Sequence, residues 1–349
     1  MLNKSNFTLE HIKNLHAKTK CDPALLERVV YAFGLLEALS KTGLDFIFKG
    51  GSCLMVILSE TKRLSTDVDI LLRPGTDIYE YIKKIELIFP FTSYEEQVRE
   101  GESSIDKKHF KFLYQSPQDN RKIYILLDVV FEENYYLETE MREIKNMFID
   151  VEAPFDLVRV PTISGIIGDK LSAFAPNTIG IKYGREKELE IIKQFFDIAT
   201  LFEEISDFES VKTTYERIAI IEIRNRRIND CNTRETLMDT FNSAIAIVGR
   251  GRLFKDDYLR LKDGIRRASN HVIGDYSVAE AESHACRVAY LVANIMAKKR
   301  ELVKITDGSQ YGDKLISNRI YSKVNHMKKT DIIDFAYLYE AVLLIENID

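Results

Sequence analysis

Residues 48–72 read FKGGSCLMVILSETKRLSTDVDILL, and this stretch decides the fold that the sequence predicts. Its first half places Ser52 directly after the pair Gly50-Gly51, between a short apolar strand and an apolar run of helical length. Two glycines let the backbone turn sharply and present successive N–H groups to an anion. A helix that opens at Ser52 adds the positive end of its dipole. We interpret this turn as a phosphate-binding element, although glycine pairs more often only make turns.

The second half of the stretch carries two acids, Asp67 and Asp69, among apolar neighbours. Side chains on a strand repeat every two residues, so both carboxylates point to one face while Val68 points into the core. Mg²⁺ prefers oxygen ligands and takes one or two carboxylates together with substrate phosphates. Two such ions clamp the attacking and leaving oxygens of a nucleotidyl transfer. The alternative is a solvent-facing strand that happens to carry two acids.

The composition is that of an intracellular globular protein. The chain has 349 residues, of which 45% are hydrophobic and 30% charged, and its net charge of -5 gives no overall sign of nucleic-acid binding. Its four cysteines are scattered and show no metal-binding spacing. We find neither a signal peptide nor a run of about 18 apolar residues that would span a membrane. We therefore expect a soluble, cytoplasmic protein without membrane association, in an oligomeric state that the sequence does not indicate.

The periodicity of apolar residues predicts two regions of different secondary structure. Up to about residue 160 helices and strands are mixed, and beyond it the segments have helical spacing without clear strands. The helices expected in the first region are 23–41, 51–60 and 77–89, and the strands are 45–48, 67–73, 108–116, 122–132 and 156–163. In the second region the clearest helices are 164–175 and 186–205.

The glycine–serine turn and the acid pair are more specific together than either is alone. They resemble the signature of the DNA polymerase β-type nucleotidyltransferase superfamily, which is G-[GS], a short spacer and D-x-[DE] between apolar positions. The resemblance implies an α+β fold, with a polymerase β-like nucleotidyltransferase domain and a short mixed sheet in residues 1–160, and a helical C-terminal domain in residues 161–349. It also implies a third carboxylate on a later strand.

Asp128, in YILLDVVF, is the candidate for that third carboxylate. An acid within an apolar strand is costly to bury unless it is paired or bound to a metal. The alternative places Asp128 at the rim of the sheet, where water solvates it.

Four blocks of the chain extend the resemblance to a narrower family. They are FKGGSCLM (48–55), RLSTDVDILL (63–72), GDKLSAFAPNTIG (168–180) and KQFFDIATLF (193–202). In this order they resemble the blocks of the AbiEii/AbiGii-type nucleotidyltransferase toxins, which are the toxin halves of bacterial type IV toxin–antitoxin and abortive-infection systems. The resemblance covers roughly residues 45–205.

The family resemblance implies catalytic roles for Lys170, as a cation for triphosphate oxygens, and for Asp197. The family often has a further acid three residues before the latter position, where this chain has Gln194. Two alternatives remain open. In the first, Lys170 is a solvated surface lysine. In the second, Asp197 does no more than pair with Lys193, one helical turn earlier.

The implied reaction moves a nucleoside monophosphate from a nucleoside triphosphate to an acceptor hydroxyl and releases pyrophosphate. The implied ligands of two Mg²⁺ ions are Asp67, Asp69 and Asp128. The implied triphosphate ligands are Lys49, Gly50, Gly51, Ser52 and Lys170. Arg63 is expected to brace the loop before the acids, and Tyr183, Arg185 and Lys187 lie where nucleotide or acceptor would pass.

The resemblance implies an RNA acceptor, with the tRNA 3′ end as the leading candidate, and a cognate antitoxin as a partner. A nucleotide added at that end would block aminoacylation and stop translation. Basic runs of the C-terminal region suit phosphate contacts, namely RNRR (224–227), GRGRLFK (249–255), GIRR (264–267), KKRELVK (298–304) and HMKK (326–329). Basic runs on helices are commonly only solvated faces, and that alternative stays open.

Three other functions remain open. A small-molecule nucleotidyltransferase, such as an aminoglycoside-modifying enzyme, needs an acidic pocket for its cationic substrate. A transferase acting on a protein would move a nucleotide or phosphate to that protein, for example its antitoxin. A non-catalytic module with a decayed site is disfavoured, because the glycine–serine turn and the three acids are all intact.

Overall fold

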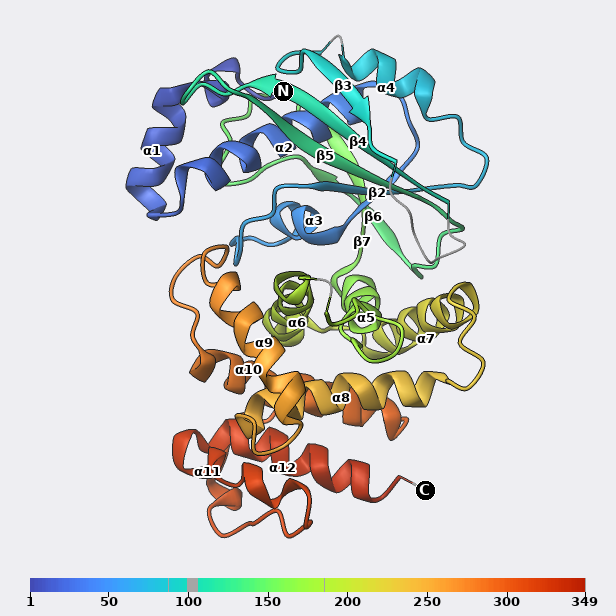
Figure 1. Ribbon diagram of the computed structural model, residues 1–349, viewed down its shortest axis with the longest axis vertical. Helices are drawn as coiled ribbons and strands as arrows, with labels where there is room; N and C mark the ends of the chain where they lie inside the picture. The colour runs from blue at the N-terminus through green and yellow to red at the C-terminus, as the bar shows by residue number, and fades with distance from the viewer. Residues whose placement is uncertain (87, 99–105, 185, 349) are drawn as a thin grey trace. The chain divides into compact units, whose positions relative to one another are not determined.

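The chain divides into two units, each with its own core. The computed structural model describes residues 1–86, 88–98, 106–184 and 186–348 (Figure 1). Unit 1 consists of Met1–Thr162 together with Asn270–Gly274, and unit 2 consists of Ile163–Ser269 together with Asp275–Asp349. The two units are described separately below.

Unit 1 is built on a five-stranded mixed sheet with the strand order β1-β2-β5-β4-β3. The strands are β1 (Ile47–Lys49), β2 (Val68–Leu72), β3 (Ser93–Glu96), β4 (Asp106–Gln115) and β5 (Lys122–Phe131). β2 and β5 are parallel, and the other neighbours are antiparallel. A separate antiparallel pair is formed by β6 (Thr139–Glu143) and β7 (Leu157–Pro161). The sequence did not predict β3 and β6, because SYEE and TEMRE lack an apolar alternation.

The helices of unit 1 cover one face of the sheet and its edges. They are α1 (Leu9–Thr19), α2 (Pro23–Lys41), α3 (Gly50–Ile57) and α4 (Tyr79–Glu86). α2 begins where the sequence predicted, because the Asp22 carboxylate accepts hydrogen bonds from the N–H groups of Ala24 and Leu25. It packs against β5 (Figure 1). On the two longest strands every second residue is fully buried, namely Phe110, Phe112 and Tyr114 on β4 and Ile125, Leu127 and Val129 on β5.

The loop that leads into β2 is held by a segment from far along the sequence. The Leu64 N–H donates to the His271 carbonyl at 2.7 Å, and the Ile273 N–H donates to the Lys62 carbonyl at 3.0 Å. Arg63 and Val272 form an antiparallel bridge between them. The short segment 270–274 therefore belongs to unit 1, although it lies between two helices of unit 2.

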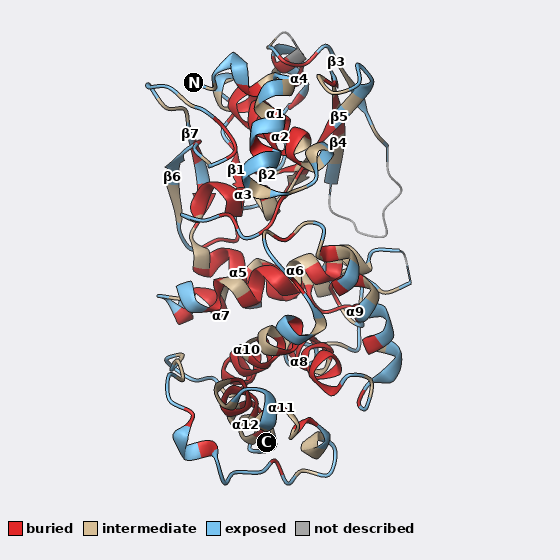
Figure 2. Cartoon of the chain, turned by 90° about the vertical axis from the view of Figure 1, so that its left-hand side faces the viewer, coloured by how far each residue is buried: buried red, intermediate tan, exposed pale blue. Residues whose placement is uncertain are grey.

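Unit 2 is helical, and its described residues contain no strand. Its main helices are α5 (Ile163–Ala173), α6 (Glu188–Leu201), α7 (Phe208–Asn225), α8 (Thr233–Gly249), α9 (Lys255–Ala268), α10 (Val278–Met296), the short α11 (Met327–Thr330) and α12 (Ile332–Glu346). α10 packs against α8, α12 and α6. Figure 2 shows buried residues along α5, α6 and α10.

The predicted fold class is confirmed: a mixed α+β region with a five-stranded sheet precedes a helical C-terminal region. In the described part of the chain, every helix is too short or too polar to cross a lipid bilayer.

Candidate active site

The strand register lines up one polar side chain from each of four adjacent strands. Lys49 on β1 is paired with Asp69 on β2, Asp69 with Asp128 on β5, and Asp128 with His109 on β4. Paired residues on neighbouring strands point to the same face of a sheet. All four are half-buried, whereas their neighbours in sequence Val68, Phe110 and Val129 are fully buried on the opposite face. We call Lys49, Asp69, Asp128 and His109 the polar row.

Contacts hold both ends of the polar row. His109 Nδ1 lies 2.6 Å from Asp128 Oδ1. At the other end, Lys49 Nζ donates to the Tyr135 hydroxyl and lies 5.2 Å from the centre of the Tyr135 ring. The acids are therefore flanked by a cation and an imidazole, which reduces the repulsion between two carboxylates on adjacent strands.

Asp67 lies immediately before β2, two residues from Asp69. Its Oδ1 accepts a hydrogen bond from Arg28 Nη2 of α2 at 3.3 Å. The Asp67 side chain is 44% exposed and the Asp128 side chain 26% exposed, so solvent and small ligands reach both. The shared face of Asp67 and Asp69 stays a prediction, because Asp67 precedes the strand. The sequence did not indicate that Arg28 would approach Asp67.

The glycine pair packs tightly against the polar row. Gly50 has φ +77°, and a Cβ there would overlap Asp69 Oδ2. A Cβ on Gly51 would lie 2.6 Å from Arg63 Nη2 and 2.7 Å from Ser65 Oγ. Gly50 is therefore required by its left-handed backbone as well as by its neighbour, whereas a side chain at Gly51 would have to displace the ends of the Arg63 and Ser65 side chains. Arg63, which is 7% exposed, packs against the turn, and whether it also braces the site stays a prediction.

Ser52 lies in the first turn of α3 and is buried. Its hydroxyl donates to the backbone carbonyl of Asp67, which fastens the start of α3 to the chain that enters β2. This contact joins the two halves of the stretch on which the sequence prediction rested. The predicted contact of Ser52 with phosphate stays a prediction.

The three acids fit a divalent cation in donor chemistry and in strand position. Carboxylates are the hard oxygen ligands that Mg²⁺ prefers, and Asp69 and Asp128 are paired on strands that lie about 4.8 Å apart. Asp67 is directed toward Arg28 and Asp128 toward His109. With the side chains in these orientations, no three His, Cys, Asp or Glu residues of the described part of the chain are placed so that they would hold a metal ion together. Metal binding at Asp67, Asp69 and Asp128 stays a prediction.

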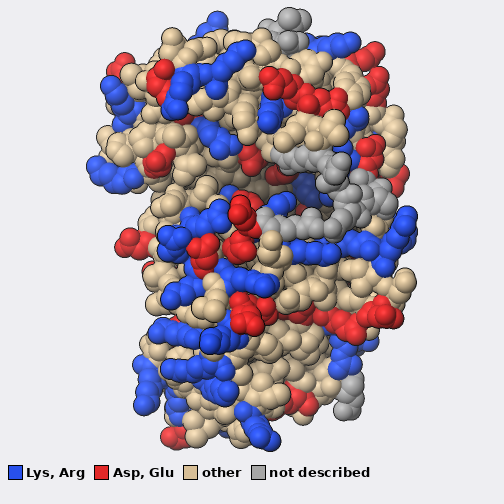
Figure 3. All heavy atoms as spheres, in the orientation of Figure 1, with Lys and Arg blue, Asp and Glu red and all other residues tan. Residues whose placement is uncertain are grey.

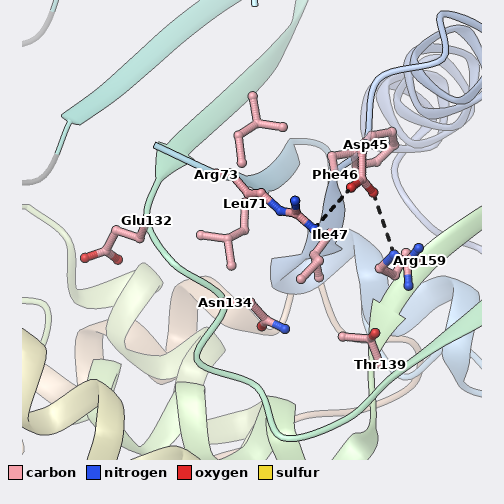
Figure 4. A pocket seen from close by; sticks show the side chains of 10 residues that line it. Asp45, Phe46, Ile47, Leu71, Arg73, Glu132, Asn134, Thr139 and Arg159 are labelled. Atoms are coloured by element: carbon pink, nitrogen blue, oxygen red, sulfur yellow. Dashed lines mark ion pairs between the residues drawn. The ribbon is translucent and has the colours of Figure 1, made fainter. Parts of the chain in front are cut away.

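A cavity of about 180 Å³ lies next to the polar row within unit 1 (Figure 4). Its apolar wall includes Ile47 and Leu71, which are paired across β1 and β2. Ile47 lies two residues from Lys49, and Leu71 lies two residues from Asp69. At its rim Asp45 lies 3.8 Å from the guanidinium of Arg73 and 3.9 Å from that of Arg159. Other polar residues of the lining are Glu132, Asn134 and Thr139.

Lys170 and Asp197 form a buried ion pair within unit 2. Lys170 Nζ, on α5, lies 2.6 Å from Asp197 Oδ2, on α6, and 3.1 Å from Gln194 Oε1. The two charged side chains are 5% and 2% exposed. Both alternatives that the sequence left open are therefore wrong. Lys170 is not a surface lysine, and Asp197 pairs with Lys170, while Lys193 pairs with Glu190 at 3.0 Å.

The residues between these two blocks have different surroundings. The Arg260 guanidinium lies 5.2 Å from the centre of the half-buried Tyr183 ring, and burial raises the pKa of the Tyr183 hydroxyl well above its usual value. Lys187 is exposed and precedes α6. Arg185 lies outside the described residues. Their predicted contacts with nucleotide or acceptor stay predictions.

The structure thus gathers the predicted residues into two groups. In unit 1 it brings Lys49, the glycine turn and the acids together and adds three residues that the sequence did not reveal, namely Arg28, His109 and Tyr135. In unit 2 it joins Lys170 to Asp197 through the packing of α5 on α6.

Comparison with known proteins assigns this architecture to the nucleotidyltransferases. The sequence profile of the nucleotidyl transferase AbiEii toxins, of type IV toxin–antitoxin systems, matches residues 34–270, which is more than half of the chain. The chain belongs to this family. It is therefore a nucleotidyltransferase of a toxin family, and the predicted family is confirmed.

Two solved structures from Helicobacter pylori show similarity to the chain. JHP933 is 12% identical, with a TM-score of 0.45 over 78% of this chain and 93% of its own. A candidate nucleotidyltransferase is 14% identical, with a TM-score of 0.45 over 78% of this chain and 96% of its own. None of the curated proteins matches the chain.

Proposed function

We propose that this protein uses Mg²⁺ to transfer a nucleoside monophosphate from a nucleoside triphosphate to RNA, with the tRNA 3′ end as acceptor. The transfer would block aminoacylation and stop translation in the cytoplasm, until a cognate antitoxin opposes it. The observation that carries the proposal is the register pair of Asp69 and Asp128, with the Gly50 backbone packed against the carboxylate of Asp69.

The three acids and His109 take the metal-binding part of this proposal. Asp67, Asp69 and Asp128 would hold two Mg²⁺ ions, which when bound supply charge neutralisation at the triphosphate and acidify the acceptor hydroxyl. His109 orients the Asp128 carboxylate through its 2.6 Å contact. Asp128 is also the residue we propose to accept the proton of the acceptor hydroxyl.

Binding of the nucleotide relies on groups at the edge of the row. The Gly50-Gly51 backbone, Ser52 and Lys49 are placed at the start of α3, where a helix N-terminus favours negative charge. The neighbouring cavity has an apolar wall and amide and hydroxyl groups in its lining, which suits a nucleoside. Binding and orientation of this kind account for most of the catalysis in phosphoryl transfer.

Lys170 and Asp197 complete the proposed set. The ammonium group of Lys170 is fixed by Asp197 and Gln194, so its charge has a defined position in unit 2. We propose that Lys170 contributes a cation for the triphosphate oxygens and that Asp197 positions it.

The cavity gives no support to a small-molecule acceptor of cationic type. Its rim carries Arg73 and Arg159 as well as Asp45 and Glu132, so it is not an acidic pocket. Transfer to a protein such as the antitoxin remains the main competing outcome of the experiment below.

Incubation of the purified protein with Mg²⁺, each labelled nucleoside triphosphate in turn and total RNA tests the proposal. We expect label on the tRNA band with one triphosphate, and none when Asp69→Asn replaces the wild type. Addition of the candidate antitoxin to parallel reactions controls for a protein acceptor. Label that appears only on protein, or only on a small molecule, would contradict an RNA acceptor.

A further inference from the structure

The basic runs of unit 2 differ in the contacts that they make. Arg266 and Arg267 approach opposite oxygens of Asp263 at 2.9 and 3.8 Å. Arg226 pairs with Glu222 at 2.8 Å. These three arginines have partners close by in sequence, as on the solvated, salt-bridged face that we left open.

Two other segments have an extreme charge balance. Residues 250–255 and 314–329 together contain eight Lys and Arg and no Asp or Glu, in a chain whose net charge is -5. The first segment joins α8 to α9, and the second ends in α11. The second segment lies beyond the family match at residues 34–270, so family membership assigns nothing to it.

One hydrogen bond joins the two segments, and a second lies within the longer one. Lys323 Nζ donates to the backbone carbonyl of Arg252 at 3.2 Å. Lys328 Nζ donates to the backbone carbonyl of Lys314 at 3.1 Å. We call the resulting group the two-segment basic surface, and its members are Arg252, Lys314, Lys323, Lys328 and Lys329.

Within the described part of the chain, none of the five members of this surface forms an ion pair. Arg250, in the same loop, differs because it pairs with the buried Glu282. Asp331 follows the second segment, but its carboxylate accepts the N–H groups of Ile333 and Asp334 and so caps α12. In Figure 3, Lys and Arg side chains gather at the lower left of the face shown, where Figure 1 labels α10 and α11.

The loop between α8 and α9 holds an aromatic ring beside these cations. Phe254 and Arg250 both have φ +48°, in the left-handed region that L residues rarely adopt. Such conformations cost energy and are concentrated at functional sites. The Phe254 side chain is among the exposed large hydrophobic residues, at 37% exposure. An exposed ring next to unpaired cations is the combination that binds single-stranded nucleic acid, through base stacking and phosphate contacts.

We propose that the two-segment basic surface binds the phosphate backbone of the RNA acceptor and that Phe254 stacks on one of its bases. This inference rests on the proposed transfer to RNA. An acidic protein would also be attracted by the charges, but the exposed ring and the polyanionic acceptor of the proposed reaction favour RNA.

Binding of fluorescently labelled tRNA in the absence of nucleotide tests the inference. The variant Lys323→Gln/Lys329→Gln removes two charges of the surface, and Lys13→Gln/Lys18→Gln removes two exposed charges of α1 as a matched control. Between about 50 and 200 mM salt, we expect the first variant to weaken binding about tenfold and to reduce the salt slope by about 1 to 2. The control should bind as the wild type does. Equal melting temperatures of all three proteins would exclude misfolding.

Phe254→Leu separates stacking from charge. We expect it to weaken tRNA binding about fivefold or more, with an unchanged salt slope. The inference would be overturned if the lysine variant bound tRNA as the wild type does, or if the control variant lost as much affinity. It would also be overturned if polyglutamate, added as a competitor, displaced tRNA as readily as unlabelled tRNA does. Because no nucleotide is present, the result is independent of whether label is transferred to RNA, so this inference and the proposed function fail separately.

Discussion

The two groups of predicted site residues lie in contrasting surroundings. In unit 1 Asp69 and Asp128 lie on a sheet face and Asp67 directly precedes β2, and the side chains of Asp67 and Asp128 are 44% and 26% exposed. In unit 2 the side chains of Lys170 and Asp197 are 5% and 2% exposed and touch each other. Half-exposed carboxylates can be neutralised with little effect on the fold, whereas removing one partner of a buried pair leaves an uncompensated charge. Activity alone therefore tests the first group, while the second also requires a measurement of stability.

The largest effect is expected at the polar row. Asp69→Asn and Asp128→Asn keep the shape of each side chain but remove its charge, so we expect each to lower the transfer rate on the order of a thousandfold or more. Because both residues are half-buried, the melting temperature should stay close to that of the wild type. Asp119→Asn, at an exposed acid in the β4–β5 turn, is the control. A retained rate within tenfold of the wild type would remove the acid pair from the mechanism.

The buried pair is the second way to test the contrast. Lys170→Met leaves Asp197 buried without its partner, and we expect a loss of about 3–5 kcal/mol in the free energy of unfolding, measured by urea titration. It should also abolish transfer.

The double variant Lys170→Met/Asp197→Leu separates fold from catalysis. An apolar pair replaces a buried ion pair at little cost, so most of the stability should return. Transfer should remain absent if Lys170 acts on the triphosphate. Return of activity together with stability would show that the pair only supports the fold.

The glycine turn gives a smaller and local effect. Gly50→Ala introduces a Cβ against Asp69 at φ +77°, and we expect it to reduce transfer about a hundredfold, because the carboxylate is displaced. Gly75→Ala is the matched control, since Gly75 has φ +81° but nothing within 4 Å of its Cβ. Both variants share the strain of a left-handed alanine, about 1 kcal/mol. Equal activity of the two would mean that contact with Asp69 does not matter.

The smallest effect concerns pH and the fold of unit 2. Burial, with a contribution from Arg287 against an opposing one from Glu280, lowers the pKa of His284 to about 4. The unfolded chain takes up a proton near pH 6.5 and the folded chain only near pH 4, so acidification between these values favours unfolding. His284→Leu should remove on the order of 2–3 kcal/mol of this pH dependence. Denaturant titrations across that range measure it, with His16→Leu, at an exposed histidine, as the control. If the free energy of unfolding changed with pH in the same way for the wild type and for His284→Leu, the assignment of this pH dependence to His284 would be contradicted.

Local patterns predicted much of unit 1. The alternation of DVDILLR indicates the strand β2, and the apolar run around Asp128 indicates β5. The glycine pair and the apolar run after it predicted the start of α3. These features depend on neighbours in sequence, so the residues themselves contain the information.

Features that depend on long-range contacts were not predictable in the same way. The alternation of KHFKFLYQ places His109 on the polar face, but only the register of β4 on β5 brings it to Asp128. Arg28 approaches from α2, and the segment 270–274 returns to the loop before β2 from beyond α9. Nor does helical spacing reveal that Asp197 pairs with Lys170 on α5 and not with Lys193 one turn away.

Binding of Mn²⁺, as a paramagnetic substitute for Mg²⁺, tests the central claim most directly. Electron paramagnetic resonance measures free Mn²⁺ in the presence of a non-hydrolysable nucleoside triphosphate, with the nucleotide alone as reference. We expect the wild type to bind Mn²⁺ beyond what the nucleotide binds, and Asp69→Asn and Asp128→Asn to lose that extra binding. Equal Mn²⁺ binding by the wild type and both variants would contradict the assignment of these two carboxylates as metal ligands.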